Sequence, residues 1–272
     1  MQKALFVFFG LYFVLVLKSQ AQFILRENSV AQVIRRMPAF TIYKDNFFIT
    51  GITLGEKVSK YNADAKYQIS FKQRLLNAAL PFKTSLFLTY SQKSFWDIYT
   101  LSSPFAETNY NPGLALGKLI FKNGKLIGRA GITLEHESNG KDSLNSRSWN
   151  FISFIYLANL SAQTQLTLKA WLPFLAEENA DLTTYIGYGE ARFSWIILEN
   201  KLHVDIYARK GAAFDWKGSL QTEISFKPFK SENQFVMVQW WQGHAESLIH
   251  YQESTSHLRI GMVIKPTYYN LY

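Results

Sequence analysis

The sequence predicts an all-β fold, a transmembrane antiparallel β-barrel of about twelve strands. Three observations lead to this prediction. The 272 residues are 48% hydrophobic and 16% aromatic but only 18% charged, so much of the surface is expected to face something other than water. The chain begins like an exported protein. Segments of alternating polarity then follow one another, with turn residues between them.

The first 21 residues are interpreted as a secretory signal. Lys3 precedes an apolar run that ends at Leu17, and Ser19-Gln20-Ala21 provides a small-x-small cleavage pattern. A retained transmembrane anchor is the less favoured alternative, because the run is shorter than the ~20 residues that a span needs. Residues 22–39, with Arg35-Arg36, are expected to form an N-terminal periplasmic or barrel-plugging segment, and residues 40–272 the barrel domain.

Strand-like segments fill the rest of the chain. In one of them, Leu202, Val204, Ile206 and Ala208 alternate with polar residues, as expected for a strand with one apolar face. Each segment has ~10 residues, the length of a tilted membrane strand. They begin near Phe40, Lys66, Lys83, Gly113, Lys125, Arg147, Ala162, Thr183, Lys201, Asp215, Gln234 and His257.

A soluble β-sandwich would show the same alternation. The export signal, the aromatic C-terminal Tyr272 and aromatics near strand ends favour a membrane barrel, in which such residues form interfacial girdles. Charged or strongly polar residues interrupt every later apolar run, which excludes a helical membrane protein. The girdle candidates are Tyr90, Phe95, Trp96, Trp149, Trp171, Trp195, Trp240 and Trp241.

Charge and cysteine content narrow the possible functions. Cysteine is absent, which excludes disulfides, thiolate metal sites and thiol catalysis. Removal of residues 1–21 leaves 27 basic and 20 acidic residues, a net charge of +7. This balance suits anionic lipid headgroups. Nucleic acid is the alternative partner, but the chain contains no nucleic-acid-binding motif and no basic tail.

Polar residues with catalytic potential lie at the end of an apolar segment. In residues 125–138 the two-residue period places His136 and Ser138 on the apolar face with Leu134. A hairpin centred on Ser143 would set His136 opposite Asn150, with Cβ atoms ~5 Å apart. Serine, histidine and asparagine could then act as nucleophile, base and orienting group of a hydrolase.

The alternative is that these residues have no catalytic role, since His-x-Ser is common by chance and an asparagine near a turn is often a turn residue. However, three polar side chains on a lipid-facing surface are costly without a function. A zinc peptidase is disfavoured because Gly140 replaces the second histidine of H-E-x-x-H. The G-x-S-x-G elbow is also absent. A non-enzymatic porin or structural barrel remains the stronger alternative.

The same residues resemble the active-site signature of the outer-membrane phospholipase A family. The resemblance rests on His136-Glu-Ser138-Asn139-Gly140, followed after five residues by Ser146-Arg-Ser-Trp-Asn150. Segments 92–96, 102–112 and 243–251 are similar to further family segments. The resemblance implies a twelve-stranded barrel in the outer membrane of a diderm bacterium. Its expected activity is calcium-dependent phospholipid hydrolysis, of phospholipase A1/A2 and lysophospholipase type, by a homodimer.

The resemblance also implies roles for individual residues. Ser138 would be the nucleophile, His136 the base and Asn150 its orienting group, with the Gly140 amide serving the oxyanion. Ca²⁺ would bind the Ser146 hydroxyl, the Lys141 carbonyl and the Ser102 hydroxyl of the other subunit, and Gln92 would lie in the dimer interface. Lys141 stands where the family usually has arginine, residues 142–145 differ from the family, and the C-terminal end is longer.

Overall fold

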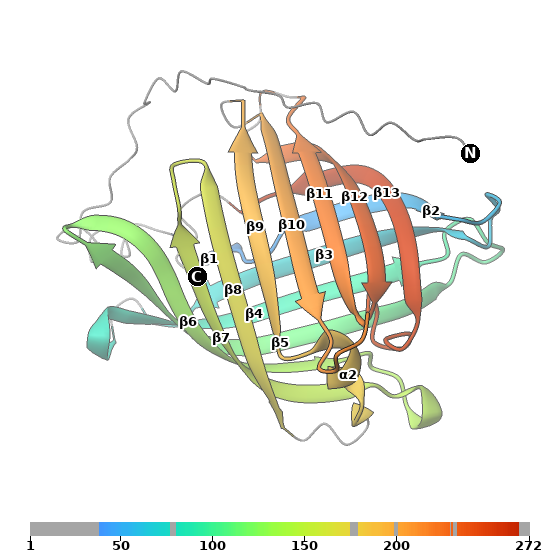
Figure 1. Ribbon diagram of the computed structural model, residues 1–272, viewed down its shortest axis with the longest axis horizontal. Coiled ribbons are helices and arrows are strands. Elements are labelled where there is room, and N and C mark those ends of the chain that lie inside the picture. Colours follow the sequence, from blue (N-terminus) through green and yellow to red (C-terminus); the bar gives the residue numbers. More distant parts are fainter. Residues whose placement is uncertain are drawn as a thin grey trace, which may run out of the picture.

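The computed structural model describes residues 38–76, 80–174, 179–198, 201–228, 230 and 233–266. Their strands form one antiparallel sheet in the order β1-β3-β2-β13-β12-β11-β10-β9-β8-β7-β6-β5-β4, and β3 also pairs with β4. That pairing closes the sheet into the barrel of Figure 1. The strands are β1 (Phe40–Ile42), β2 (Asn46–Thr53), β3 (Ala63–Arg74), β4 (Thr84–Trp96), β5 (Phe105–Lys122), β6 (Lys125–Ser138), β7 (Ser148–Asn159), β8 (Thr164–Phe174), β9 (Gly189–Ile197), β10 (Leu202–Lys210), β11 (Gly218–Phe226), β12 (Gln234–His244) and β13 (Ser254–Ile264).

The barrel has twelve strand positions, as predicted, because β1 and β2 share one of them. Both pair with β3, β1 through Phe71–Gln73 and β2 through Ala63–Gln68. Residues 43–45 interrupt the strand between them. Three short helices accompany the strands: η2 (Pro81–Lys83), η3 (Ser143–Asn145) and α2 (Leu182–Ile186). No helix in the described ranges is long and apolar enough to cross a membrane.

Neighbouring strands run in opposite directions, so the connections gather at two ends of the barrel. The connections after β2, β4, β6, β8, β10 and β12 share one end, which we term the site end. It contains η3 between β6 and β7, and α2 between β8 and β9. Residues at the ends of β4, β6 and β8 therefore meet at one rim of the barrel.

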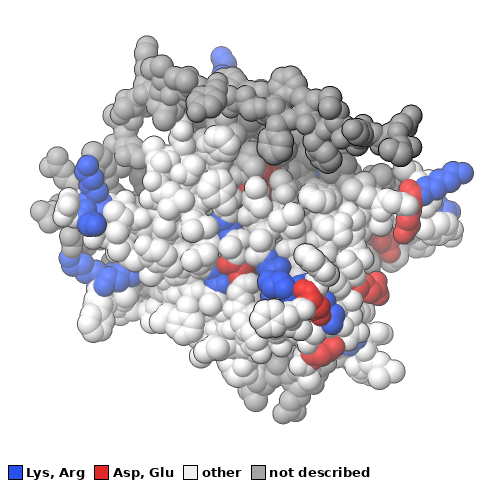
Figure 2. Space-filling view, viewed as in Figure 1, with Lys and Arg blue, Asp and Glu red and all other residues white. Residues whose placement is uncertain are grey.

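Side chains alternate between the outer wall and the lumen. On β6, Ile132 and Leu134 are about half exposed, whereas Thr133 and Glu135 between them are buried. The same alternation holds on β10, where Asp205 and Tyr207 line the lumen and Ile206 between them is exposed. Charged side chains are sparse on the face shown in Figure 2. An apolar outer wall around a closed barrel is the arrangement of an outer-membrane protein, whose backbone polar groups are all paired within the sheet.

Packed side chains and ion pairs occupy the lumen. At the site end, α2 and the loop after β12 pack in a cluster that contains Leu182, Ile186, Leu248 and Tyr251 together with lumen-facing Trp149. A cavity of about 1010 Å³, lined by both charged and apolar side chains, remains inside the barrel. The interior is therefore largely filled at the end where the candidate catalytic residues lie.

Two strand predictions need correction. β5 begins at Phe105, eight residues before the predicted Gly113, because residues 105–112 continue the ladder with β4. Pro112 pairs with Tyr90 on that side, but the pairing of β5 with β6 skips from Tyr110 to Gly113, as expected for a residue without an N–H. The segment predicted to begin as a strand at Thr183 starts instead with α2, and β9 follows at Gly189.

The predicted aromatic girdle is only partly correct. Phe95, Trp149, Trp171 and Trp241 are buried inside the barrel rather than placed on its outer surface. The next residue along each strand points outward. A shift of one residue in the strand therefore decides whether a side chain faces the lumen or the outer surface. Trp195 is outward and 41% exposed. The predicted signal of residues 1–21, Tyr272 and all but the last two residues of the predicted segment 22–39 lie outside the described residues.

Candidate active site

The predicted hairpin register between β6 and β7 is confirmed. His136 pairs with Asn150, and Ser138 pairs with Ser148. The Nδ1 atom of His136 lies 3.0 Å from the Oδ1 atom of Asn150. A carboxamide oxygen can only accept a hydrogen bond, so Nδ1 carries the proton in this pair. In the neutral imidazole with this tautomer, the other ring nitrogen, Nε2, is the one that can accept a proton.

His136 and Ser138 belong to the outer wall of the barrel. They follow Leu134, which is 50% exposed, in the same two-residue alternation, while Glu135 points to the lumen. Both side chains are half-buried. Within the described residues, no hydrogen bond joins Ser138 to His136. Such contacts are often longer in the free enzyme than in the substrate complex.

Gly140 has a special conformation in the loop that follows β6. Its φ angle is +64°, in the left-handed region that favours glycine. A Cβ atom at this position would lie 3.0 Å from the Cε2 atom of Tyr110, so the ring of Tyr110 lies directly beside this exposed residue. In the described part of the chain, the Gly140 N–H donates to no acceptor. A backbone N–H of this kind is available to a ligand at the end of β6.

Asn139 holds this loop together, a role that was not predicted. Its Oδ1 atom accepts from the amides of Lys141 (3.3 Å) and Arg147 (3.0 Å). Its Nδ2 atom donates to the Asn145 carbonyl at 2.8 Å. Only 4% of Asn139 is exposed. The only sequence signal was an asparagine between the candidate nucleophile and a glycine, a position where asparagine often bonds nearby backbone.

The predicted metal ligands lie in two loops at the site end. Lys141 and Ser146 belong to the loop tied by Asn139, and the Nζ atom of Lys141 donates to the Ala106 carbonyl at 2.9 Å. Ser102 lies in the connection between β4 and β5, at a φ of +65°. The neighbouring Ser103 anchors that connection, because its carbonyl accepts from the Trp96 indole N–H at 2.7 Å.

Gln92 lies on the outer wall, two strands away from Ser138. The strand register pairs Gln92 with Tyr110 and Tyr110 with Ser138, so the three residues form a row across β4, β5 and β6. Neighbouring strands are ~4.8 Å apart. The Oε1 atom of Gln92 accepts from the Tyr90 hydroxyl at 2.9 Å. An amide group therefore lies on the apolar wall close to the candidate triad.

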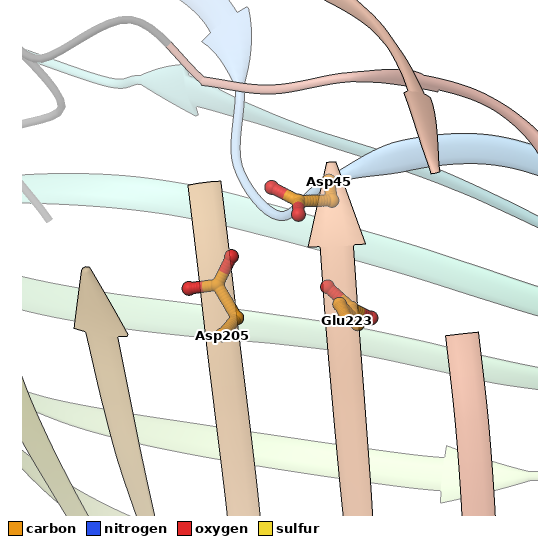
Figure 3. Close-up of side chains that lie close together, drawn as sticks. All are labelled: Asp45, Asp205 and Glu223. Atoms are coloured by element: carbon orange, nitrogen blue, oxygen red, sulfur yellow. The ribbon is translucent and has the colours of Figure 1, made fainter. Parts of the chain in front are cut away.

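A cluster of carboxylates lies elsewhere, in the lumen. Asp45, Asp205 and Glu223 point toward one another, and their oxygens lie within 4.8 Å (Figure 3). The Nζ atom of Lys265 lies 2.7 Å from Asp45 and 3.0 Å from Asp205. Arg192 forms a further ion pair with Asp205 at 2.9 Å. These two cations offset the charges of Asp45 and Asp205, whereas Glu223 accepts from the Gln221 and Gln239 amides.

Comparisons with known proteins agree with the fold and the motif. The family model described as phospholipase A1 matches residues 37–264. A Salmonella typhimurium phospholipase A1 is 28% identical over 224 residues, which cover 77% of this chain and 74% of the relative. A Neisseria meningitidis protein, named provisionally as a phospholipase A1, is also 28% identical. That alignment covers 78% of this chain but only 58% of the Neisseria protein.

Solved structures show the same fold. The chain is similar to outer membrane phospholipase A from Escherichia coli, with a TM-score of 0.74 and 24% identity, over 85% of this chain and 100% of that one. It is equally similar, with a TM-score of 0.74 and 23% identity, to the Salmonella typhi outer membrane phospholipase, solved as a dimer with bound calcium; that match covers 87% of this chain and 97% of the other. By its family match and its closed barrel, the chain belongs to the phospholipase A1 family of outer-membrane β-barrel enzymes.

Proposed function

We propose that this barrel hydrolyses acyl ester bonds of phospholipids, with A1/A2 and lysophospholipase activity, through a lipid-facing triad of Ser138, His136 and Asn150. The observation that carries the proposal is the 3.0 Å contact between His136 and Asn150 on the outer wall. A polar pair of this kind has no evident structural purpose on a surface that faces hydrocarbon. Its position suits a substrate that arrives from the membrane.

The reaction follows from the donor and acceptor roles of the three side chains. Nε2 of His136 takes the proton of Ser138 as Oγ attacks the ester carbonyl. Asn150 accepts from Nδ1–H and keeps the imidazole in the required tautomer. The imidazolium then gives its proton to the leaving alkoxide, and the acyl group stays on Ser138. Water, activated by the same histidine, releases the fatty acid and restores Ser138.

The oxyanion would be stabilised at the loop after β6. The Gly140 N–H lies two residues after Ser138 and has no acceptor in the described part of the chain. The oxygens of Ser146, Lys141 and the other subunit's copy of Ser102 fit calcium, which prefers oxygen ligands. Two of them are neutral hydroxyls, so weak binding is expected. Bound calcium would supply positive charge near the developing oxyanion.

A homodimer is the proposed active form. Gln92 and Ser138 share one row of the outer wall, so a second barrel docked on Gln92 would lie beside the triad. Buried amide groups of two subunits can hydrogen-bond each other across such an apolar interface. The groove between the barrels would hold the acyl chain. Each subunit would supply its Ser102 hydroxyl to the calcium site of the other subunit. We expect calcium-saturated monomers to be inactive.

Fatty-acid release from phospholipid micelles tests the proposal. The Ser138→Ala variant should lose activity, while Ser161→Ala, in the turn between β7 and β8 at the opposite end, should match the wild type. Calcium titration of the wild type should restore activity lost to a chelator. Equal rates for wild type and Ser138→Ala would favour the non-enzymatic barrel.

A further inference from the structure

The loop of residues 211–217, between β10 and β11 at the site end, exposes two large aromatic side chains. Phe214 and Trp216 have relative exposures of 110% and 101%. They lie two residues apart, and among the described residues neither ring takes part in an aromatic or cation–π contact. Single exposed apolar residues are ordinary, but two adjacent and completely exposed aromatic rings are not. The proposed reaction makes no use of them.

The base of this loop is held firmly. The Gly211 amide donates to the Lys217 carbonyl at 3.0 Å, and the Ala212 amide donates to the Thr183 carbonyl of α2 at 3.1 Å. A Cβ atom on Gly211 would lie only 2.3 Å from the Thr184 carbonyl oxygen. The loop is thus packed closely on the α2 segment, and its two aromatic rings are presented from a fixed support.

Charged residues flank the aromatic tip. Asp215 lies between the rings and forms ion pairs with Lys217 at 3.1 Å and Lys210 at 3.6 Å. Its Oδ1 atom also accepts the Lys217 amide at 3.0 Å. Two cations and one anion leave the tip with a single positive charge. Apolar rings next to basic side chains suit the boundary between acyl chains and anionic headgroups.

The lipid-facing wall leads directly to this loop. Ile206 on β10 and Leu220 on β11 are outward and partly exposed, and each is within five residues of the loop. Trp is enriched where a barrel wall meets the headgroups. The loop tip is therefore continuous with the lipid-facing surface of the barrel. The partner that the two rings would contact is the same lipid leaflet.

We propose that Phe214 and Trp216 anchor the loop in the headgroup region of the leaflet at the site end. The rings enter the boundary with the acyl chains, and Lys210 and Lys217 face the phosphates. This anchor lies on a different side of the barrel from β6, so it would fix the height and tilt of the barrel in the bilayer. The proposal does not depend on the proposed hydrolysis.

The absence of cysteine allows a direct test. Phe214→Cys is labelled with an environment-sensitive fluorophore and reconstituted in vesicles that contain phosphatidylglycerol and nitroxide-labelled lipids. Lys57→Cys, an exposed position in the connection after β2 at the same end, is the matched control. Headgroup-level nitroxides should quench most of the emission at 214 and little at 57. The emission at 214 should also shift to the blue, and iodide in the water should quench mainly position 57.

Trp216→Phe gives a second, label-free measurement. The fraction of tryptophan emission that lipid nitroxides quench should fall in this variant relative to wild type. Equal iodide quenching at 214 and 57, with no effect of lipid nitroxides, would overturn the proposal. Emission at 214 that changes with the protein-to-lipid ratio, rather than with the nitroxide lipid, would assign the tip to a contact between two copies and would also overturn it.

Discussion

At the scale of single residues, the outward position of His136, Ser138 and Asn150 could be predicted from the sequence. It depends only on the two-residue period of a strand and on the symmetry of a hairpin around Ser143. Both are local properties. The contact between His136 and Asn150 at 3.0 Å then fixes the tautomer of the imidazole, which the proposed reaction requires.

Replacement of Asn150 tests that contact. Asn150→Ala removes the acceptor for Nδ1–H, so the imidazole can adopt the wrong tautomer, and kcat should fall by about 10²-fold. Asn150→Asp keeps an oxygen acceptor at the same position and should retain most of the activity. Steady-state hydrolysis of phospholipid in mixed micelles provides the measurement. Equal rates for Asn150→Ala and wild type would rule out the orienting role.

The role of Asn139 could not be predicted, because it depends on how a loop unlike that of the family folds back on itself. Asn139→Ala leaves two amides and one carbonyl without their partner, at a cost of about 1–3 kcal/mol each when buried. We expect a higher calcium concentration for half-maximal activity. Asn139→Asp keeps the oxygen acceptor. Its calcium concentration for half-maximal activity should therefore lie between those of the wild type and Asn139→Ala. An unchanged calcium titration in Asn139→Ala would show that the loop does not need this side chain.

At the scale of elements, the loop after β12 is locked inside the barrel by charge. The carboxylate of Glu246 lies 2.9 Å from the Lys66 ammonium and 2.7 Å from the Arg259 guanidinium. The loop backbone is bound as well, since Glu107 accepts the Ile249 amide at 2.8 Å. These partners come from β3, β5 and β13. The loop therefore joins strands that are distant in the sequence.

A fall in pH should weaken the ion pairs of Glu246 that hold the loop after β12 inside the barrel. Burial alone would raise the pKa of Glu246, but Lys66 and Arg259 overcome that effect and hold the pKa well below its usual range. A depressed pKa contributes stability that is present above the unfolded value, about 4.3, and is lost as the pH falls toward the folded pKa.

Glu246→Gln provides the corresponding variant. It leaves the buried Lys66 ammonium without its counter-charge, while Arg259 keeps Asp64 at 2.7 Å, so the free energy of unfolding at neutral pH should fall by about 3 kcal/mol. The difference in unfolding free energy between the wild type and Glu246→Gln should shrink as the pH falls below about 4, because Glu246 of the wild type then becomes protonated and loses its negative charge. Guanidinium unfolding of the reconstituted barrel at several pH values measures both effects. A difference between the two proteins that does not vary with pH would contradict this account.

β5 and α2 differ from the predictions made for their segments, and the reason lies in contacts between elements. The sequence placed the start of this strand near Gly113, but pairing with β4 extends β5 back to Phe105. Leu182 and Ile186 are four residues apart and both buried, which suits a helical turn packed on the lumen cluster. In each case a long-range contact decided the outcome, whereas the prediction used only neighbouring residues.

At the scale of the whole molecule, the packed site end of the lumen separates this barrel from an open porin. The cluster around Leu248 occupies the site end, and Lys265, Asp205 and Arg192 cross the interior with ion pairs. We predict no steady ion conductance of porin size in planar bilayers, with an outer-membrane porin as positive control. A stable open-channel current from the pure protein would contradict the closed lumen.

The barrel as a whole followed from the sequence, since twelve alternating segments and an export signal leave few other folds. Which aromatics face lipid did not follow from their enrichment near strand ends. Trp149 and Trp171 are buried in the lumen cluster, one pleat from the outer wall. Assignment of each side requires the exact register of its strand.

Covalent labelling of the nucleophile tests the central claim most directly. A long-chain alkyl fluorophosphonate should react with Ser138 Oγ in calcium-containing micelles; the oxygen displaces fluoride and forms a phosphonate ester that mass spectrometry can locate. Labelling should disappear in the His136→Ala variant and in the presence of chelator. A triad on the lipid-facing wall predicts one adduct, at Ser138. An adduct at another residue, or undiminished labelling of His136→Ala, would contradict it.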